Sequence, residues 1–195
     1  MLATYVLFYL MTTFTLTYGT AAADPETGPA GLGYARVDFL WMLIVGVVFF
    51  AAFTLASGPL AERYGRRKHL IVVTVAIIVF GGLFVPLFAG GTTGVQALLI
   101  VGFSLMGLTF GPMAAVLPEL FAANVRYTGS AIAYNVSSIL GAAVAPFIAV
   151  WLWGKADGSP VLVGAYLSVM AVITLVALVL EKETQNVDYD GRLSD

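Results

Sequence analysis

The chain has 195 residues, of which 60% are hydrophobic and 10% are charged, and its mean hydropathy is +0.95. Such a chain would expose more apolar surface than water tolerates, which excludes an ordinary soluble domain and indicates a lipid environment. The net charge of −2 says nothing about orientation, because membrane topology follows the placement of Lys and Arg rather than their sum.

The residue types that enzymatic and metal chemistry need are scarce. There is no cysteine, so disulfides, thiol nucleophiles and thiolate metal sites are excluded, and His69 is the single histidine. We can assemble no acid–base pair, nucleophile or cofactor loop from the sequence. We therefore predict no enzyme, no cofactor, no metal site and no nucleic-acid partner.

Six apolar segments are each about long enough to cross a hydrocarbon core of about 30 Å, which takes about 20 helical residues. Because the runs are continuous rather than alternating with a period of two, helices are favoured over strands. The predicted fold is all-α, with a transmembrane domain over residues 1–180 and a cytoplasmic tail over 181–195. The six predicted spans are Leu2–Thr20, Phe39–Leu60, Leu70–Phe88, Val95–Leu117, Thr128–Trp153 and Val161–Leu180.

Cations gather in the loops on one side of this predicted bundle. If the side that holds Glu62–Lys68 is inside, only two cations, Arg36 and Lys155, lie outside. This asymmetry predicts that both chain ends are cytoplasmic. The inside cations are Arg63, Arg66, Arg67, Lys68, Arg126, Lys182 and Arg192.

The first and fifth spans are the polar ones. Tyr5 and Tyr9 lie one helical turn apart on one face of the first span. Either they belong to an interfacial belt while the threonines near them bond the i−4 carbonyl, or they face a water-filled path. Asn135 in the fifth span needs an interhelical hydrogen bond, worth about 0.6–2 kcal/mol, or a substrate. Tyr5, Tyr9 and Asn135 are therefore our candidates for the substrate pathway.

Pro112 predicts a kink in the fourth span, which serves either as a gating hinge or as a packing feature. The stretch Gly58–Lys68 is a charged turn in which Gly58 and Gly65 permit close backbone approach and a positive φ.

Three motifs on the inside carry a family resemblance. Gly58–Arg67 resembles the signature loop of the major facilitator superfamily, with Glu62 where aspartate is usual. Pro118–Gly129 is similar to the sequence after the tenth helix of sugar porters and metabolite:proton symporters, and Glu181–Gln185 to that after their twelfth helix. The order of the motifs implies the C-terminal six-helix half of a twelve-helix transporter. Metabolite:proton symporters are the most similar subfamily, and sugar porters are the alternative.

The resemblance implies a cytoplasmic gate, in which opposite charges latch the helix ends in one transport state and separate in the other. The alternative is a loop whose cations only fix the topology. In the family, Glu62 faces a helix N-terminus of the opposite half, where an anion gains about 0.3–1 kcal/mol. The gate residues are Gly58, Glu62, Arg63, Gly65, Arg66, Arg67, Glu119, Arg126 and Glu183.

The function that the resemblance implies is proton-coupled symport of a small organic acid or osmolyte by alternating access in the cell membrane. No carboxylate lies in the middle of a span, so we expect the proton-binding residue in a half outside this chain. Six helices form one wall of a cavity, and the expected partner is an N-terminal six-helix half or a second copy. The alternatives are a non-transporting truncated product, which the start of a span directly at Met1 favours, and an accessory membrane subunit.

Overall fold

The computed structural model describes residues 2–24, 26, 28–119, 121 and 124–180. Within these ranges every regular element is a helix, and no strand occurs, which confirms the all-α prediction. The elements are α1 (Leu2–Tyr9), η1 (Leu10–Phe14), α2 (Thr15–Thr20), α3 (Arg36–Tyr64), α4 (Arg66–Gly82), α5 (Phe84–Ala89), α6 (Gly91–Glu119), α7 (Arg126–Ser138), η2 (Ile139–Ala143), α8 (Ala145–Lys155) and α9 (Val161–Leu180).

Four helical stretches in the described part of the chain are long and apolar enough to cross a membrane, which makes this a multi-pass membrane protein. They are Arg36–Tyr64, Gly91–Pro118, Arg126–Lys155 and Val161–Leu180. They correspond to the second, fourth, fifth and sixth predicted spans.

The first and third predicted spans are helical but interrupted. The N–H of Thr15 donates to the carbonyl of Leu10, five residues back, so η1 is a π-helical segment between α1 and α2. The third run ends as α4 at Gly82 and restarts as α5 at Phe84, because Pro86 has no N–H for the carbonyl four residues before it. The longest unbroken α-helix of the two runs is α4, with 17 residues. Both runs therefore differ from straight membrane helices.

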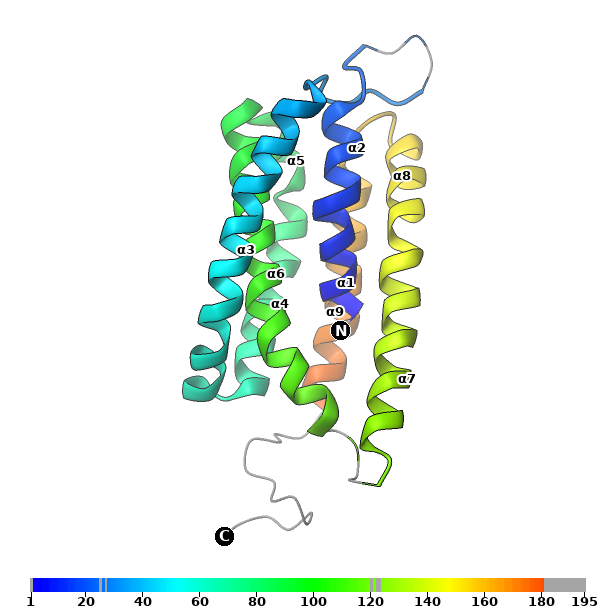
Figure 1. The fold of residues 1–195 in the computed structure, drawn as a ribbon. Coiled ribbons are helices and arrows are strands. Elements are labelled where there is room, and N and C mark those ends of the chain that lie inside the picture. The colour runs from blue at the N-terminus through cyan, green and yellow to red at the C-terminus, as the bar shows by residue number, and fades with distance from the viewer. Residues whose placement is uncertain (1, 25, 27, 120, 122–123, 181–195) are drawn as a thin grey trace.

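The helices stand side by side in one bundle, and α1–α2 lie between α3 and α7–α8 in the view of Figure 1. The turn between α3 and α4, the start of α7 and the end of α9 are at the same end of the bundle. We call it the basic end, because it carries Arg63, Arg66, Arg67, Lys68 and Arg126. These segments were predicted to share one side, and the fold brings them together.

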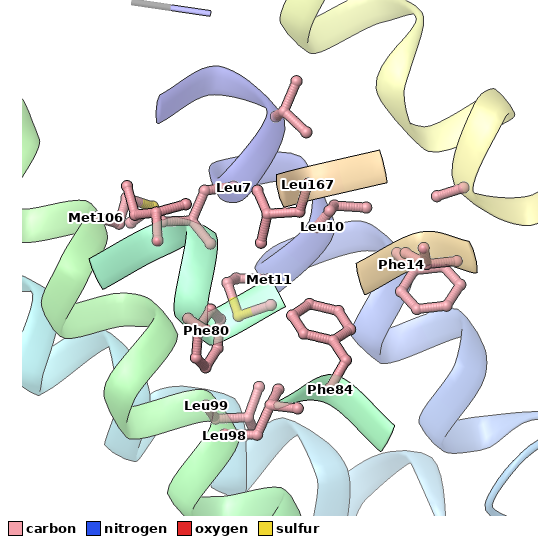
Figure 2. Close-up of a cluster of buried hydrophobic side chains, with 14 of the residues drawn as sticks. Leu7, Leu10, Met11, Phe14, Phe80, Phe84, Leu98, Leu99, Met106 and Leu167 are labelled. Atoms are coloured by element: carbon pink, nitrogen blue, oxygen red, sulfur yellow. The ribbon is translucent and has the colours of Figure 1, made fainter. Parts of the chain in front are cut away.

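The core is packed around the first helical run, with side chains from α4, α5, α6 and α9 (Figure 2). Lipid tails are as apolar as leucine, so this packing is stabilised by van der Waals contact rather than by transfer out of water. Fully or almost fully buried members include Leu7, Leu10, Met11, Phe14, Phe80, Phe84, Leu98, Leu99, Met106 and Leu167.

Glycines let two pairs of helices approach closely. Between α4 and α9, a Cβ on Gly81 would lie 2.6 Å from the carbonyl oxygen of Gly164. At the same crossing, the Ser168 hydroxyl donates to the carbonyl of Ile78 at 2.9 Å. Between α3 and α6, a Cβ on Gly107 would lie 2.6 Å from the carbonyl oxygen of Phe50. Only glycine fits at such separations, as is common where membrane helices cross.

Gly81→Ala tests the α4–α9 crossing, with Gly82→Ala as the matched control one residue away. A Cβ at position 82 would meet no described atom within 4 Å, whereas one at 81 would meet α9. We expect Gly81→Ala to lower the free energy of unfolding by about 1–3 kcal/mol and Gly82→Ala to leave it nearly unchanged. Equilibrium unfolding in detergent micelles measures both, and equal effects of the two variants would contradict the close crossing.

Candidate functional site

The charged turn at the basic end depends on Gly65. Its φ of 89° and ψ of 130° connect the last residue of α3 to the first residue of α4. An L-residue with a side chain is strained at this φ, so the positive φ predicted for the turn is confirmed here. Gly58 differs, because a Cβ there would meet no described atom within 4 Å. Within the described chain, the space beside Gly58 is therefore open, and no neighbouring helix packs closely against this glycine.

Arg67 joins the turn to the last helix. Its Nε donates to the carbonyl of Leu178 at 2.9 Å, and one of its terminal nitrogens donates to the carbonyl of Val179 at 2.6 Å. The last carbonyls of a helix have no partner inside the helix and form the negative end of its dipole. Arg67 therefore caps the C-terminus of α9 from the first turn of α4.

The other predicted gate residues lie around this cap. Glu62 and Arg63 are exposed in the last turn of α3, and the Arg63 guanidinium lies 5.7 Å from the centroid of the Tyr64 ring. Arg66 is half-buried at the start of α4. Glu119 is described only as the last residue of α6, and Glu183 lies outside the described residues. The charge latch that these residues were predicted to form stays a prediction.

A hollow of about 620 Å³ opens at the basic end between α6 and α7. Arg126 is the first residue of α7, and its Nε donates to the carbonyl of Phe121 at 3.4 Å. The lining residues are Leu117, Pro118, Arg126, Tyr127, Ser130, Ala131 and Tyr134. Because the α7 members recur at spacings of three and four, they form one face of that helix.

Tyr134 connects this hollow with Tyr5. The two rings meet edge to face, with their centroids 5.6 Å apart. Tyr5 is 6% exposed, and its buried hydroxyl has no hydrogen-bond partner among the described residues. Tyr134 is 47% exposed and covers Tyr5 on the side of the hollow. The structure therefore places Tyr5 behind Tyr134 rather than on an open surface.

The other two pathway candidates do not join this pair. Tyr9 is half-buried, and its ring contacts Phe8 at a centroid distance of 5.1 Å. Asn135 is exposed, and its Nδ2 donates to the carbonyl of Ala131 in its own helix at 2.7 Å. The bond that the structure gives Asn135 is therefore local, in contrast to the interhelical bond expected from the sequence.

Both polar helical runs contain a π-helical segment, η1 in the first and η2 in the fifth predicted span. A Cβ on Gly141 in η2 would lie 2.6 Å from the Cβ of Tyr5, so α1 packs directly on η2 at Tyr5. Single π-helical turns are frequent at functional sites, because they shift the side chains of a helix relative to a regular α-helix. The Tyr5–Tyr134 pair is built on such a junction.

The threonines of the first run use their hydroxyls locally, as one of the two interpretations predicted. Thr12 donates to Phe8 at 2.8 Å, Thr17 to Thr13 at 2.9 Å and Thr20 to Leu16 at 2.8 Å, in each case to the i−4 carbonyl. These three also line a hollow of about 500 Å³ away from the basic end, together with Thr13, Leu16, Ala21 and Arg36. Among the described residues, no three His, Asp or Glu side chains gather as a metal site would require.

Comparison with known proteins identifies the family. Residues 27–191 match the sequence profile of the sugar (and other) transporter family. The chain belongs to this family. The predicted resemblance to the major facilitator superfamily is thereby confirmed, and the relatives are membrane transporters rather than enzymes.

Three curated relatives of this transporter chain illustrate the similarity. The inner membrane metabolite transport protein YhjE of Escherichia coli is 50% identical over 188 residues, which cover 95% of this chain and 41% of that protein. A putative metabolite transport protein of Haemophilus influenzae is 46% identical over 192 residues, 96% of this chain and 43% of that protein. The proline/betaine transporter of Escherichia coli is 31% identical over 153 residues, 76% and 29% of the two chains. The chain thus spans less than half the length of these relatives. No solved structure matches it significantly.

Two features of this transporter chain were missed by sequence reasoning. Tyr127 and Ser130 were not singled out, although their spacing to Arg126 and Tyr134 follows one helical face and could have indicated the hollow. The cap of α9 by Arg67 had no signal in the sequence, because it joins residues more than a hundred positions apart. Only the folded bundle brings the two ends together.

Arg67→Gln tests the cap of α9. Glutamine can replace at most part of the two charge-assisted bonds, so we expect the free energy of unfolding to fall by about 1–2 kcal/mol. Arg63→Gln is the control, since Arg63 is exposed at the same end of the bundle. Hydrogen exchange of the Leu178–Leu180 amides should increase in Arg67→Gln and not in Arg63→Gln. Unchanged exchange in both variants would show that Arg67 does not hold this helix end.

Proposed function

We propose that this chain forms the C-terminal half of a major facilitator transporter that couples uptake of a small metabolite to protons by alternating access. The observation that carries the proposal is the 50% identity with the YhjE metabolite transport protein over 95% of this chain. The substrate class that we propose is a small organic acid or osmolyte. A relative named as a proline/betaine transporter supports this class.

The same proposal assigns six membrane spans, with the two interrupted runs as the first and third. Breaks in membrane helices are tolerated where neighbouring groups satisfy the freed backbone. The run Leu2–Thr20 is about as long as a span, and the run Arg66–Ala89 is longer. With the basic end in the cytoplasm, as the excess of cations there favours, both termini are cytoplasmic.

In this proposal the substrate passes along the side of the bundle on which α7 is exposed beside the first helical run. Tyr134 and Asn135 present polar groups there, and Tyr5 lies one layer behind them. The hollow beside Arg126 lies between α6 and α7 at the basic end, and the hollow beside Arg36 lies along η1 and α2, away from that end. The opposite wall is supplied by an N-terminal six-helix half or by a second copy, and the proton-binding carboxylate belongs to that wall.

A second candidate is a non-transporting fragment or an accessory membrane subunit. The chain spans 41% and 43% of the length of the YhjE and Haemophilus influenzae relatives. A sugar porter is the remaining alternative, supported by the family description but not by the first span, which lacks the paired glutamines of sugar porters.

Uptake into proteoliposomes separates these candidates. One preparation contains this chain, and the other contains this chain joined to the part of the YhjE protein that it does not match. We expect the joined protein to accumulate labelled organic acids or betaine under an inward proton gradient, and a protonophore to abolish the accumulation. Accumulation that ignores the protonophore contradicts proton coupling, and accumulation of hexoses alone favours the sugar porter. Uptake by the chain alone would exclude the non-transporting fragment and point to a second copy as the other wall.

Tyr5→Phe tests the buried hydroxyl behind Tyr134. Because the hydroxyl has no partner among the described residues, its removal should leave the free energy of unfolding unchanged or raise it by up to about 1 kcal/mol. If substrate uses the hydroxyl, the KM for uptake should rise at least about fivefold, the cost of one lost hydrogen bond. Tyr18→Phe is the control, since Tyr18 is buried against Phe14 and Trp153 away from Tyr134. An unchanged KM in both variants removes Tyr5 from the substrate path.

A further inference from the structure

The single histidine of the chain bridges two helices. His69 lies in the first turn of α4, is 7% exposed, and places its Nε2 2.9 Å from the carbonyl oxygen of Leu108 in α6. A carbonyl oxygen only accepts hydrogen bonds, so the ring nitrogen must donate. The neutral ring therefore carries its proton on Nε2.

The carbonyl of Leu108 differs from its neighbours in α6. In an α-helix it would accept the N–H of the residue four positions later, which here is Pro112, and proline has no N–H. An unsatisfied backbone group inside a membrane protein is costly. His69 and Leu108 both line a hollow of about 440 Å³ beside this contact. His69 supplies a donor to the carbonyl that Pro112 leaves without one.

We infer that His69 is a positioning residue, which supplies a donor to the Leu108 carbonyl that Pro112 cannot serve and fixes α6 to α4. The inference rests on the proposed function only where it concerns transport. Its structural part concerns one carbonyl, that of Leu108: His69 donates a hydrogen bond to it, and Pro112 cannot.

The position of this bond divides α6 into two parts. Before Pro112, α6 is held by His69 and by the close approach of Gly107 to Phe50 in α3. After Pro112, Leu117 and Pro118 line the hollow that faces α7. The part of the inference that concerns transport is the hinge interpretation of Pro112, which lies where these two differently packed parts of α6 meet.

The ring can be observed directly, because the chain has one histidine. We expect nitrogen-15 NMR of histidine-labelled protein in micelles to show one tautomer protonated on Nε2, with slow proton exchange with water. A ring protonated on Nδ1, or one that averages rapidly between tautomers, overturns the inference. This measurement does not depend on transport or on any variant that fails to fold.

A double-mutant cycle tests the shared carbonyl. His69→Leu should lower the folding equilibrium constant about tenfold in the natural sequence, the effect of one orphaned buried acceptor. In a Pro112→Ala background, residue 112 regains its N–H, and the same histidine substitution should cost less than about threefold. His69→Gln keeps a side-chain N–H at similar reach and should restore most of the loss. Equal costs of His69→Leu in both backgrounds contradict the coupling.

Uptake by the joined protein gives the functional readout. We expect His69→Leu to lower kcat at least about fivefold with little change in KM, because the hinge and not the substrate contact is affected. Rescue of kcat by His69→Gln separates this role from general instability. A normal kcat in His69→Leu, with the tautomer and the cycle as expected, refutes the role in transport and leaves the structural bond intact. Absence of uptake in the unsubstituted joined protein concerns the proposed function alone.

Discussion

Backbone carbonyls that their own helix cannot satisfy need donors from elsewhere, and this constraint explains why the first turn of α4 matters to the rest of the bundle. The C-terminus of α9 and the missing N–H of Pro112 in α6 both leave a carbonyl without its usual intrahelical donor. Arg67 donates to the first group and His69 to the second, from positions only two residues apart. A single turn of α4 thus joins α6 and α9, and the positive φ at Gly65 sets where that turn begins.

The same constraint accounts for the threonine hydroxyls of the first run. Thr12, Thr17 and Thr20 donate their hydroxyl hydrogens to carbonyls of their own helix, which leaves the hydroxyl oxygens as acceptors. The Tyr5 hydroxyl has no such local partner within the described chain. It is buried beside the Tyr134 ring, which lines the hollow at the basic end.

The sequence was sufficient to predict the helical class, the positions of the apolar runs and the gathering of cations at one end. These properties depend on composition and on local spacing. The π-helical segment η1 was not predicted, because hydrophobic periodicity does not distinguish it from a regular α-helix. The interruption at Leu83 was not predicted either, although Pro86 is a local signal for it. The Tyr5–Tyr134 contact and the Arg67 cap join residues far apart in the chain, and no periodicity within one segment reports them. For Asn135 the sequence predicted a contact between helices, but the structure gives it a hydrogen bond to Ala131 in its own helix.

The residues on the two sides of the charged turn, at the end of α3 and at the start of α4, have different surroundings. On the α4 side, Arg67 and His69 point into the bundle and hold helices of the same chain. On the α3 side, Gly58 and Glu62 are four residues apart and therefore share a helical face, on which a Cβ at Gly58 would meet no described atom. On its α4 side the charged turn therefore holds helices of this chain together, and on its α3 side it leaves open space beside Gly58. The gate contact that the family resemblance implies for Glu62 stays a prediction.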